Sequence, residues 1–218
     1  MDEYHGQFGQ DKWLNENLFL NKKGLIFVEI GAAHPIQGSN SYFFEKTLGW
    51  NGICIDARKS ACDELKKIRL AKVIHAAISD IKRRTIFLEC GLFSGLIRYF
   101  GKIEYDNIEK FHPNKDNVVA YWVDCVPLAE LLEQNSISMV DILMIDTEGA
   151  ELTILQSITQ ELINIKVIMT ESNDRSSRIE VLDFMRNNNF TFIIGLGMDD
   201  VYINNLFISE FNVHPTNF

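Results

Sequence analysis

The chain has 218 residues, of which 46% are hydrophobic, and its formal net charge is −9. This length suits one α/β domain with a full core, and the acidic balance argues against nucleic acid as a partner. The four cysteines are scattered and form no Cys-x-x-Cys pair, which favours a reducing compartment, the cytoplasm. The polar N-terminus lacks the pattern of a signal peptide, and no apolar run is long enough to span a membrane.

Strand and helix patterns alternate along the whole chain. The predicted strands cover residues 25–30, 52–56, 72–79, 140–146 and 166–172. The predicted helices cover residues 10–20, 42–48, 59–70, 127–135, 151–163 and 179–189. Two last strands, at 190–197 and 200–208, are separated by a short turn and should pair antiparallel. We therefore expect a single domain over 1–218 with a mostly parallel seven-stranded sheet, helices on both faces and a C-terminal antiparallel β-hairpin.

Two segments stand apart from this alternation. Residues 1–23 form an N-terminal helical extension, and residues 84–123 form an aromatic-rich insertion between the third and fourth strands of the sheet. Such an insertion could be a substrate lid at the carboxyl edge of the sheet, or extra core around a β-excursion. The sequence leaves both interpretations open.

The segment 27–57 has the pattern of a nucleoside-binding unit. An apolar strand leads to Gly31, where the chain must turn sharply and let a ligand approach its backbone. Ser39 and Asn40 offer capping side chains to the next helix. The second strand ends in Asp56, at about the spacing of an acid that takes ribose hydroxyls. The unit predicts a nucleoside-bearing cofactor without naming it.

Acidic residues also follow two later strands. The strand ILMID delivers Asp146, with Glu148 and Glu151 close behind, and the next strand ends in Glu171, followed by Asn173. Such an oxygen-rich cluster could hold a divalent cation such as Mg²⁺ or take a proton from a hydroxyl group. Capping of the following helix is the structural alternative for Glu148 and Glu151, and a solvated acidic loop is the alternative for the cluster.

Several motifs together resemble the FkbM family of S-adenosylmethionine-dependent methyltransferases. The segments that carry the resemblance are Gln7 to Asp11, FVEIGA at 27–32, Ser39 and Asn40, LGWNGICID at 48–56, AAIS at 76–79 and DTEGAE at 146–151. They occur in the family's order over about three quarters of the chain. The resemblance implies a Rossmann-like class I methyltransferase fold that binds S-adenosylmethionine.

The resemblance also implies roles for individual residues. Glu29 and Gly31 would approach the methionine part of the cofactor, Asp56 the ribose, and Ala57 with Ala77 and Ile78 the adenine. The complete set expected to contact the cofactor is Glu29, Gly31, Ala32, His34, Ser39, Asn40, Asp56, Ala57, Ala77, Ile78 and Asp146. His34 and Pro35 stand where the family usually has an acid or Asn followed by Gly, so this turn should differ from its relatives.

The chemistry implied by the resemblance is O-methylation of a hydroxyl on a sugar, a glycan or another small molecule. Asp146 is the first candidate to accept the hydroxyl proton and Glu148 the second, and Glu171 completes the catalytic set. If a metal takes part, Asp146, Glu171 and Asn173 would hold it. The alternatives are an NAD-dependent oxidoreductase, which the missing G-x-G-x-x-G motif disfavours, and a non-catalytic binding module.

Overall fold

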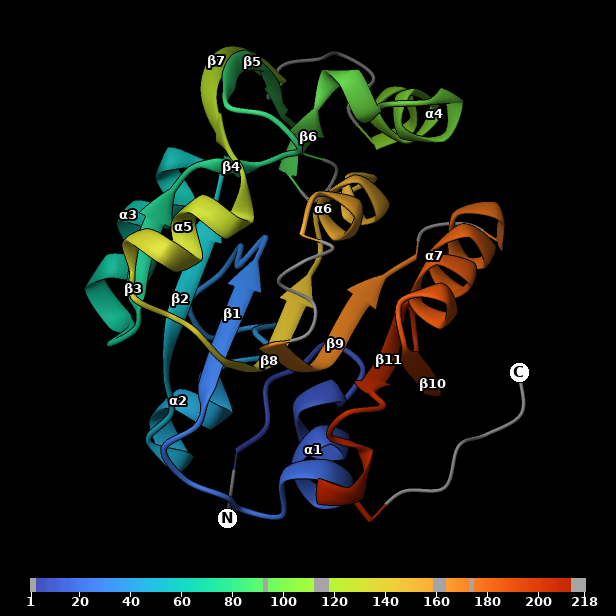
Figure 1. Cartoon of the computed structure of the whole chain (residues 1–218). Helices are drawn as coiled ribbons and strands as arrows, with labels where there is room; N and C mark the ends of the chain where they lie inside the picture. Colours follow the sequence, from blue (N-terminus) through green and yellow to red (C-terminus); the bar gives the residue numbers. More distant parts are fainter. Residues whose placement is uncertain (1–2, 92–93, 112–117, 159–163, 173–174, 213–218) are drawn as a thin grey trace.

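The computed structural model describes residues 3–91, 94–111, 118–158, 164–172 and 175–212. Its main sheet has seven strands in the order β10-β11-β9-β8-β1-β2-β3 (Figure 1). The strands are β1 (Ile26–Ile30), β2 (Asn51–Asp56), β3 (Lys72–His75), β8 (Val140–Ile145), β9 (Ile165–Glu171), β10 (Phe190–Leu196) and β11 (Asp199–Asn204). The first five pair in parallel, while β11 runs antiparallel to both β9 and β10. The predicted mostly parallel sheet with a C-terminal hairpin is confirmed.

Helices cover both faces of this sheet, as predicted. The helices are α1 (Gln10–Leu14), α2 (Tyr42–Leu48), α3 (Lys59–Ile68), α4 (Lys102–Phe111), α5 (Leu128–Gln134), α6 (Glu151–Ser157) and α7 (Arg175–Asn187). A π-helical turn at Asn15–Phe19 continues α1. Apolar residues of α5, α6 and α7 share one core cluster, and those of α1, α2 and α3 share the other. The predicted helix at 151–163 extends to Ser157 in α6, and residues 159–163 lie outside the described part.

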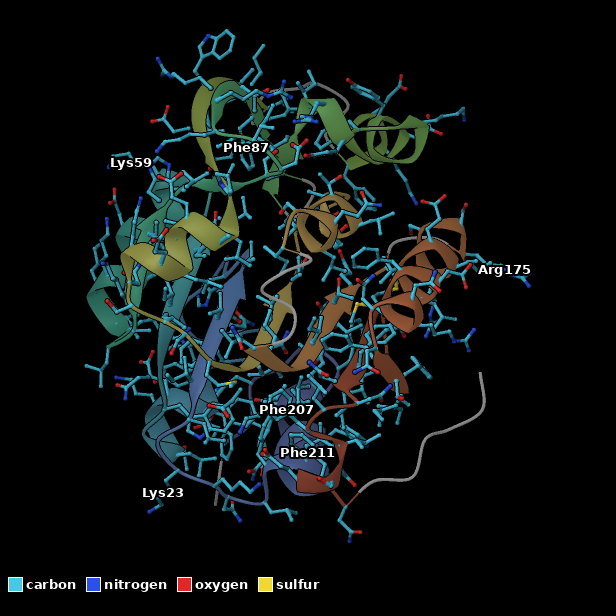
Figure 2. The ribbon with its side chains drawn as sticks, viewed as in Figure 1. Lys23, Lys59, Phe87, Arg175, Phe207 and Phe211 are labelled. Atoms are coloured by element: carbon cyan, nitrogen blue, oxygen red, sulfur yellow. The ribbon has the colours of Figure 1, made fainter. Side chains whose placement is uncertain are left out.

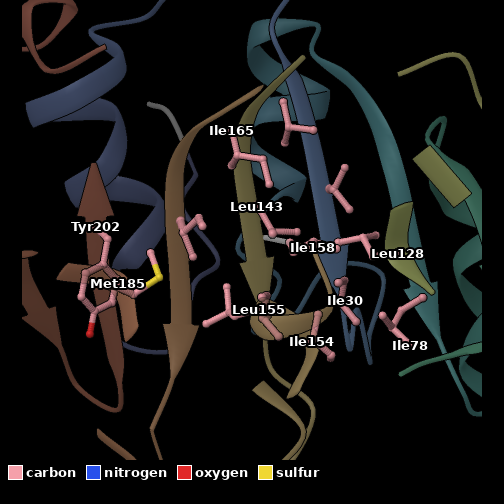
Figure 3. Packing of buried hydrophobic residues seen from close by; sticks show 14 of the residues in the cluster. Ile30, Ile78, Leu128, Leu143, Ile154, Leu155, Ile158, Ile165, Met185 and Tyr202 are labelled. Carbon is pink, nitrogen blue, oxygen red and sulfur yellow. The ribbon is translucent and has the colours of Figure 1, made fainter. Parts of the chain in front are cut away.

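Strand alternation explains the two cores. Val28 and Ile30 of β1 belong to the cluster with α5, α6 and α7, whereas Phe27 belongs to the cluster on the other face. All six residues of β8 are buried, as expected for a central parallel strand with helices on both sides. Figure 3 shows Leu143 of β8 among side chains of α6, including Ile154 and Leu155.

A second sheet of four strands lies beyond the carboxyl ends of β1 and β8, in the order β4-β7-β5-β6 (Figure 1). Its strands are β4 (Ala77–Ile78), β5 (Arg83–Glu89), β6 (Gly95–Leu96) and β7 (Val119–Val126). The single strand expected at 72–79 is therefore wrong. The amide of Ala76 bonds to the carbonyl of Asp56, after which Ala77 and Ile78 leave the main sheet and pair with β7.

The aromatic-rich segment supplies most of this second sheet. Ala77, Phe87, Leu96, Val123 and Cys125 form a small core of their own. The segment is therefore a β-excursion with extra core, the second of the two interpretations. Its role as a substrate lid stays a prediction. Figure 2 shows Phe87 in this second sheet.

The N-terminal extension packs against distant parts of the chain. Gly6 forms a β-bridge with Gly38, and the ring of Phe19 lies 6.1 Å from that of Phe211 near the other end of the chain. Figure 2 places Phe207 and Phe211 beside this extension. Among the described helices, none has the length and apolar character needed to cross a membrane.

Candidate active site

A pocket of about 360 Å³ opens at the carboxyl ends of β1, β2, β8 and β9, where open α/β sheets place their ligands. It gathers eight of the residues predicted from the sequence: Gly31, Asp56, Ala57, Ala77, Ile78, Asp146, Glu148 and Glu171. Sequence reasoning did not assign to the site other lining residues, among them Gln7, Arg58, Phe87, Ser94, Leu96 and Met198. Together these residues give the pocket two ends of different chemistry, one mostly apolar around Asp56 and one rich in carboxylates.

Asp56 occupies the first end, which we call the nucleoside end, and it is only 4% exposed. Its Oδ2 accepts a hydrogen bond from the amide of Ala33 at 2.8 Å, and its Oδ1 accepts one from the amide of Arg58 at 2.7 Å. The Arg58 guanidinium adds a bidentate contact, with Nε 3.1 Å from Oδ1 and Nη2 3.0 Å from Oδ2. The position predicted for a ribose acid is thus also the position of a salt bridge.

Apolar side chains form the walls beside Asp56. Ala77 and Ile78 belong to β4, and Phe87 and Leu96 reach the pocket from β5 and β6; all four are at most 5% exposed. A flat heteroaromatic ring fits such walls because it buries apolar faces while its edge stays polar. Ala57 lines the same end of the pocket, as the resemblance implied for the adenine.

Gly31 sits where the carboxyl ends of β1 and β8 meet. Its φ is +84°, and a Cβ built there would lie 1.7 Å from the carbonyl oxygen of Asp146. No side chain fits, so glycine is required for the contact between two strands as well as for the turn. The amides of Gly31 and Ala32 both bond to the carbonyl of Ile55, which fixes the loop against β2.

The turn at His34 and Pro35 is closed by its own side chain. His34 Nδ1 accepts hydrogen bonds from the amides of Ile36 and Gln37 at 3.2 and 2.9 Å, and His34 is exposed. These two amides are therefore engaged within the turn. The pocket is lined instead by Ala33, whose φ is +45°.

Five residues predicted to contact the cofactor are not among the lining residues: Glu29, Ala32, His34, Ser39 and Asn40. Glu29 instead accepts hydrogen bonds from the Ser41 hydroxyl at 2.6 Å and from the Asn40 amide at 3.2 Å, and it lies 3.7 Å from the buried Arg69 guanidinium. The Ser39 hydroxyl oxygen accepts from Arg69 and from the amide of Tyr42, the first residue of α2, while Ala32 joins the apolar core. Glu29, Ser39 and Asn40 thus have a supporting position around the start of α2.

Three carboxylates gather at the other end of the pocket, which we call the acidic end. One oxygen from each of Asp146, Glu148 and Glu171 lies within 4.8 Å of the others. Such a group has the donor chemistry of a hard divalent cation. Asn173, the third ligand predicted from the sequence, lies outside the described residues. The metal hypothesis stays a prediction.

The surroundings of the acidic end raise the pKa values of Asp146 and Glu171. Asp146 lines the pocket and is exposed there, and desolvation by the surrounding protein together with the charge of Glu171 raises its pKa well above the usual range. Desolvation and the charges of Glu148 and Glu151 raise the pKa of Glu171 to about 8. The two side chains share a hydrogen bond that favours protonated Asp146 and ionised Glu171. They titrate as a pair.

Glu151 organises the loop between β8 and α6. Its Oε1 accepts hydrogen bonds from both the amide and the hydroxyl of Thr147 at 2.8 Å, and its Oε2 accepts one from the amide of Gly149 at 3.0 Å. Glu151 lies in the first turn of α6, where the helix dipole favours an acid, but the hydrogen bonds of its side chain hold the preceding loop, and α6 has no side-chain cap. Glu148 lies inside the loop so formed, with a φ of +55°, and lines the pocket. A left-handed conformation at a non-glycine residue is uncommon and often marks a functional position.

The residues that sequence reasoning missed come from three single positions and from the second sheet. Arg58 follows Asp56 by two positions, Gln7 precedes α1, and Met198 lies in the turn before β11. Gln7 belongs to a motif noted in the sequence, which was a usable signal. Met198 and the residues of the second sheet carry no motif, because their place at the pocket depends on the packing of one sheet over another.

A sequence model of the methyltransferase FkbM domain matches residues 29–192. The comparison with curated proteins gives no match. Among solved structures, the chain is similar to precorrin-6y C5,15-methyltransferase from Geobacter metallireducens GS-15, with 11% identity over 84% of this chain and 79% of that one and a TM-score of 0.42. It is also similar to a methyltransferase from Pyrococcus furiosus, with 10% identity, 93% and 87% coverage and a TM-score of 0.45. It is similar as well to the N-terminal domain of human METTL16, with 10% identity over 85% of this chain and 62% of that one and a TM-score of 0.43.

The family match covers most of the chain, and it includes the ends of β2, β8 and β9, which carry the acids of the pocket. The sheet order with an antiparallel β11 between β9 and β10 agrees with the Rossmann-like fold of class I methyltransferases. The chain belongs to the FkbM family of S-adenosylmethionine-dependent methyltransferases.

Proposed function

We propose that this protein methylates a hydroxyl group of a sugar, a glycan or another small molecule. The observation that supports the proposal is the acidic end of the pocket, where Glu171 combines a pKa of about 8 with a hydrogen bond to Asp146. A carboxylate whose pKa lies near the working pH suits the removal of a proton from a hydroxyl nucleophile.

The residues of the pocket fit S-adenosylmethionine. The apolar walls at Ala77, Ile78 and Phe87 suit an adenine ring, and the carboxylates of the acidic end suit a ligand with positive charge. When bound, S-adenosylmethionine supplies a methyl group on a sulfonium that is already activated toward nucleophiles.

The protein's own part is to hold and ionise the acceptor. Protonated Asp146 donates a hydrogen bond to the Glu171 carboxylate. This bond orients Glu171, which can then accept the proton of an acceptor hydroxyl. A positive charge bound nearby lowers the pKa of Glu171, so the carboxylate is ionised at neutral pH when both ligands are present. We therefore favour Glu171 over Asp146 as the proton acceptor.

The walls of the acidic end restrict what can enter. Gln7, Thr147 and Met198 line the pocket around the carboxylates, while Phe87 and Leu96 of the second sheet close the nucleoside end. The negative charge of Glu148 and Glu171 repels acidic acceptors, and the net charge of −9 adds to this effect. A neutral polyhydroxyl compound suits the site, whereas a nucleic acid does not.

The test is transfer of a deuterated methyl group from labelled S-adenosylmethionine to a panel of sugars and small alcohols. Mass spectrometry with fragmentation would locate the label on an acceptor oxygen, and Glu171→Gln should abolish it. Label on nitrogen or carbon would contradict O-methylation. Binding of S-adenosylhomocysteine without transfer to any acceptor would favour the non-catalytic module instead.

A cation at the acidic end is the second mechanism to be tested. The same three carboxylates could chelate Mg²⁺ and lower the pKa of the acceptor hydroxyl. Proton acceptance by Glu171 predicts that a chelator leaves transfer unchanged. Loss of transfer on chelation, restored by Mg²⁺, would assign the cluster to the metal.

A further inference from the structure

We infer that Arg58 competes with the ribose of the cofactor for the carboxylate of Asp56, and that its guanidinium moves to Glu89 when the cofactor binds. Arg58 would then act as a gate on the nucleoside end of the pocket. The inference rests on the S-adenosylmethionine dependence of the family and is independent of the atom that receives the methyl group.

The first argument is the number of acceptor positions. A carboxylate offers about four lone-pair positions. Asp56 accepts hydrogen bonds from the amides of Ala33 and Arg58 and from Nε and Nη2 of Arg58. Its capacity is therefore filled, and two ribose hydroxyls can donate to it only after other donors leave.

The second argument identifies which donors can leave. The amide of Ala33 is fixed by the loop that Gly31 and Ala32 anchor to Ile55, and the amide of Arg58 precedes α3. The Arg58 side chain, by contrast, is a flexible stem that lines the pocket and is 18% exposed. Its guanidinium is the part that can yield without a change in the backbone.

The third argument is the presence of a second carboxylate for the guanidinium. The charge of Glu89, on β5, acts on Arg58 together with that of Asp56. Glu89 is held by the hydroxyl of Ser60 at 3.1 Å and by that of Tyr121 at 2.9 Å, one on each oxygen. Each oxygen thus retains a lone pair that can accept from Arg58. The second sheet thereby supplies the alternative partner.

Isothermal titration of the full chain with S-adenosylhomocysteine tests the gate. Arg58→Met removes the competitor and keeps the apolar stem, so affinity should rise about tenfold, the effect of one partly buried ion pair. Glu89→Gln removes the second partner and should weaken binding in the wild-type background, with no effect in the Arg58→Met background. The matched control is Arg84→Met, which breaks the exposed ion pair with Asp124 on the second sheet and should leave affinity unchanged.

Ligands that differ only in the ribose sharpen the result. Competition by adenosine and by 2′,3′-dideoxyadenosine measures the contribution of the hydroxyls, and Arg58→Met should increase the preference for adenosine about tenfold. Arg58→Lys, which keeps the charge but loses the fork, should give a smaller increase, and thermal unfolding would verify that each variant is folded.

Several outcomes would overturn the gate. Weaker or unchanged binding by folded Arg58→Met would show that Arg58 holds the ligand or has no effect on it. An equal loss from Glu89→Gln in both backgrounds would refute the move to Glu89. None of these results depends on an acceptor, so a failure of the O-methylation proposal would be seen separately, as absence of labelled oxygen despite normal binding.

Discussion

Asp56 and Asp146 both follow or end buried parallel strands and both line the same pocket, yet their surroundings differ. Asp56 is balanced by the guanidinium of Arg58 and by two amides. Asp146 faces other acids, and desolvation by the surrounding protein together with the charges of Glu171, Glu151 and Asp199 raises its pKa. The comparison shows how a single sheet edge can carry a charge-balanced carboxylate at one end and a cluster of carboxylates with raised pKa values at the other.

The largest effect is expected at Gly31, which lines the pocket and contacts the backbone of Asp146. Gly31→Ala would place a Cβ 1.7 Å from the carbonyl oxygen of Asp146 and would add a side chain at a φ of +84°. We expect a loss of more than about 4 kcal/mol in the free energy of unfolding, or no folded protein, as measured by chemical denaturation. Gly24→Ala is the matched control, because its φ is +68° but no atom lies within 4 Å of its added Cβ. Equal losses in both variants would contradict the steric argument.

The next effect separates the acidic end from the nucleoside end. Glu171→Gln removes the proton acceptor and should lower the rate of methyl transfer by about 10²- to 10⁴-fold, with little effect on S-adenosylhomocysteine affinity. In the wild type, kcat/KM for the cofactor should rise with pH to a plateau above about 8, the pKa of Glu171. The kcat profile should rise at lower pH, because bound positive charge lowers that pKa. Glu210→Gln, on the surface beside Lys166, serves as the control.

The raised pKa of Glu171 should also make the free energy of unfolding depend on pH when no ligand is bound. The pKa of Glu171 is raised from 4.5 to about 8 on folding, so the folded protein binds the proton more tightly than the unfolded chain. Its stabilising contribution is complete below about pH 4.5 and is lost as the pH rises through about 8. We expect the free energy of unfolding to fall by about 3 kcal/mol more in the wild type than in Glu171→Gln between pH 5 and pH 8. Parallel curves from pH-dependent denaturation would refute a raised pKa.

The smallest effect belongs to the nucleoside end. Asp56→Asn keeps the shape of the side chain but removes one acceptor oxygen and the charge that balances Arg58. We expect S-adenosylhomocysteine affinity to fall about tenfold, measured by titration calorimetry. Asp63→Asn, on the exposed side of α3, removes an acid that pairs with Lys59 and should leave affinity unchanged. Equal affinity of wild type and Asp56→Asn would show that the ribose does not use this carboxylate.

The sequence determined the order of elements and the strand ends that carry the acids. Apolar runs such as ILMI can bury the side chains of both faces only inside a sheet that is covered on both sides. Asp56 and Asp146, which end or follow such runs, therefore lie at its carboxyl edge. The glycine at position 31 and the acid in the first turn of α6, Glu151, also follow from local chemistry, since turns and helix starts depend on near neighbours.

Tertiary structure decided what each acid contacts. The break at Ala76, which turns one expected strand into two strands of different sheets, depends on pairing with β7 about 50 residues later and has no local signal. Likewise, the salt bridge of Arg58, the supporting position of Glu29 and the raised pKa of Glu171 follow from groups brought together by packing. Local pattern fixes backbone conformation, whereas charge and desolvation depend on neighbours in space, and only the folded chain supplies those.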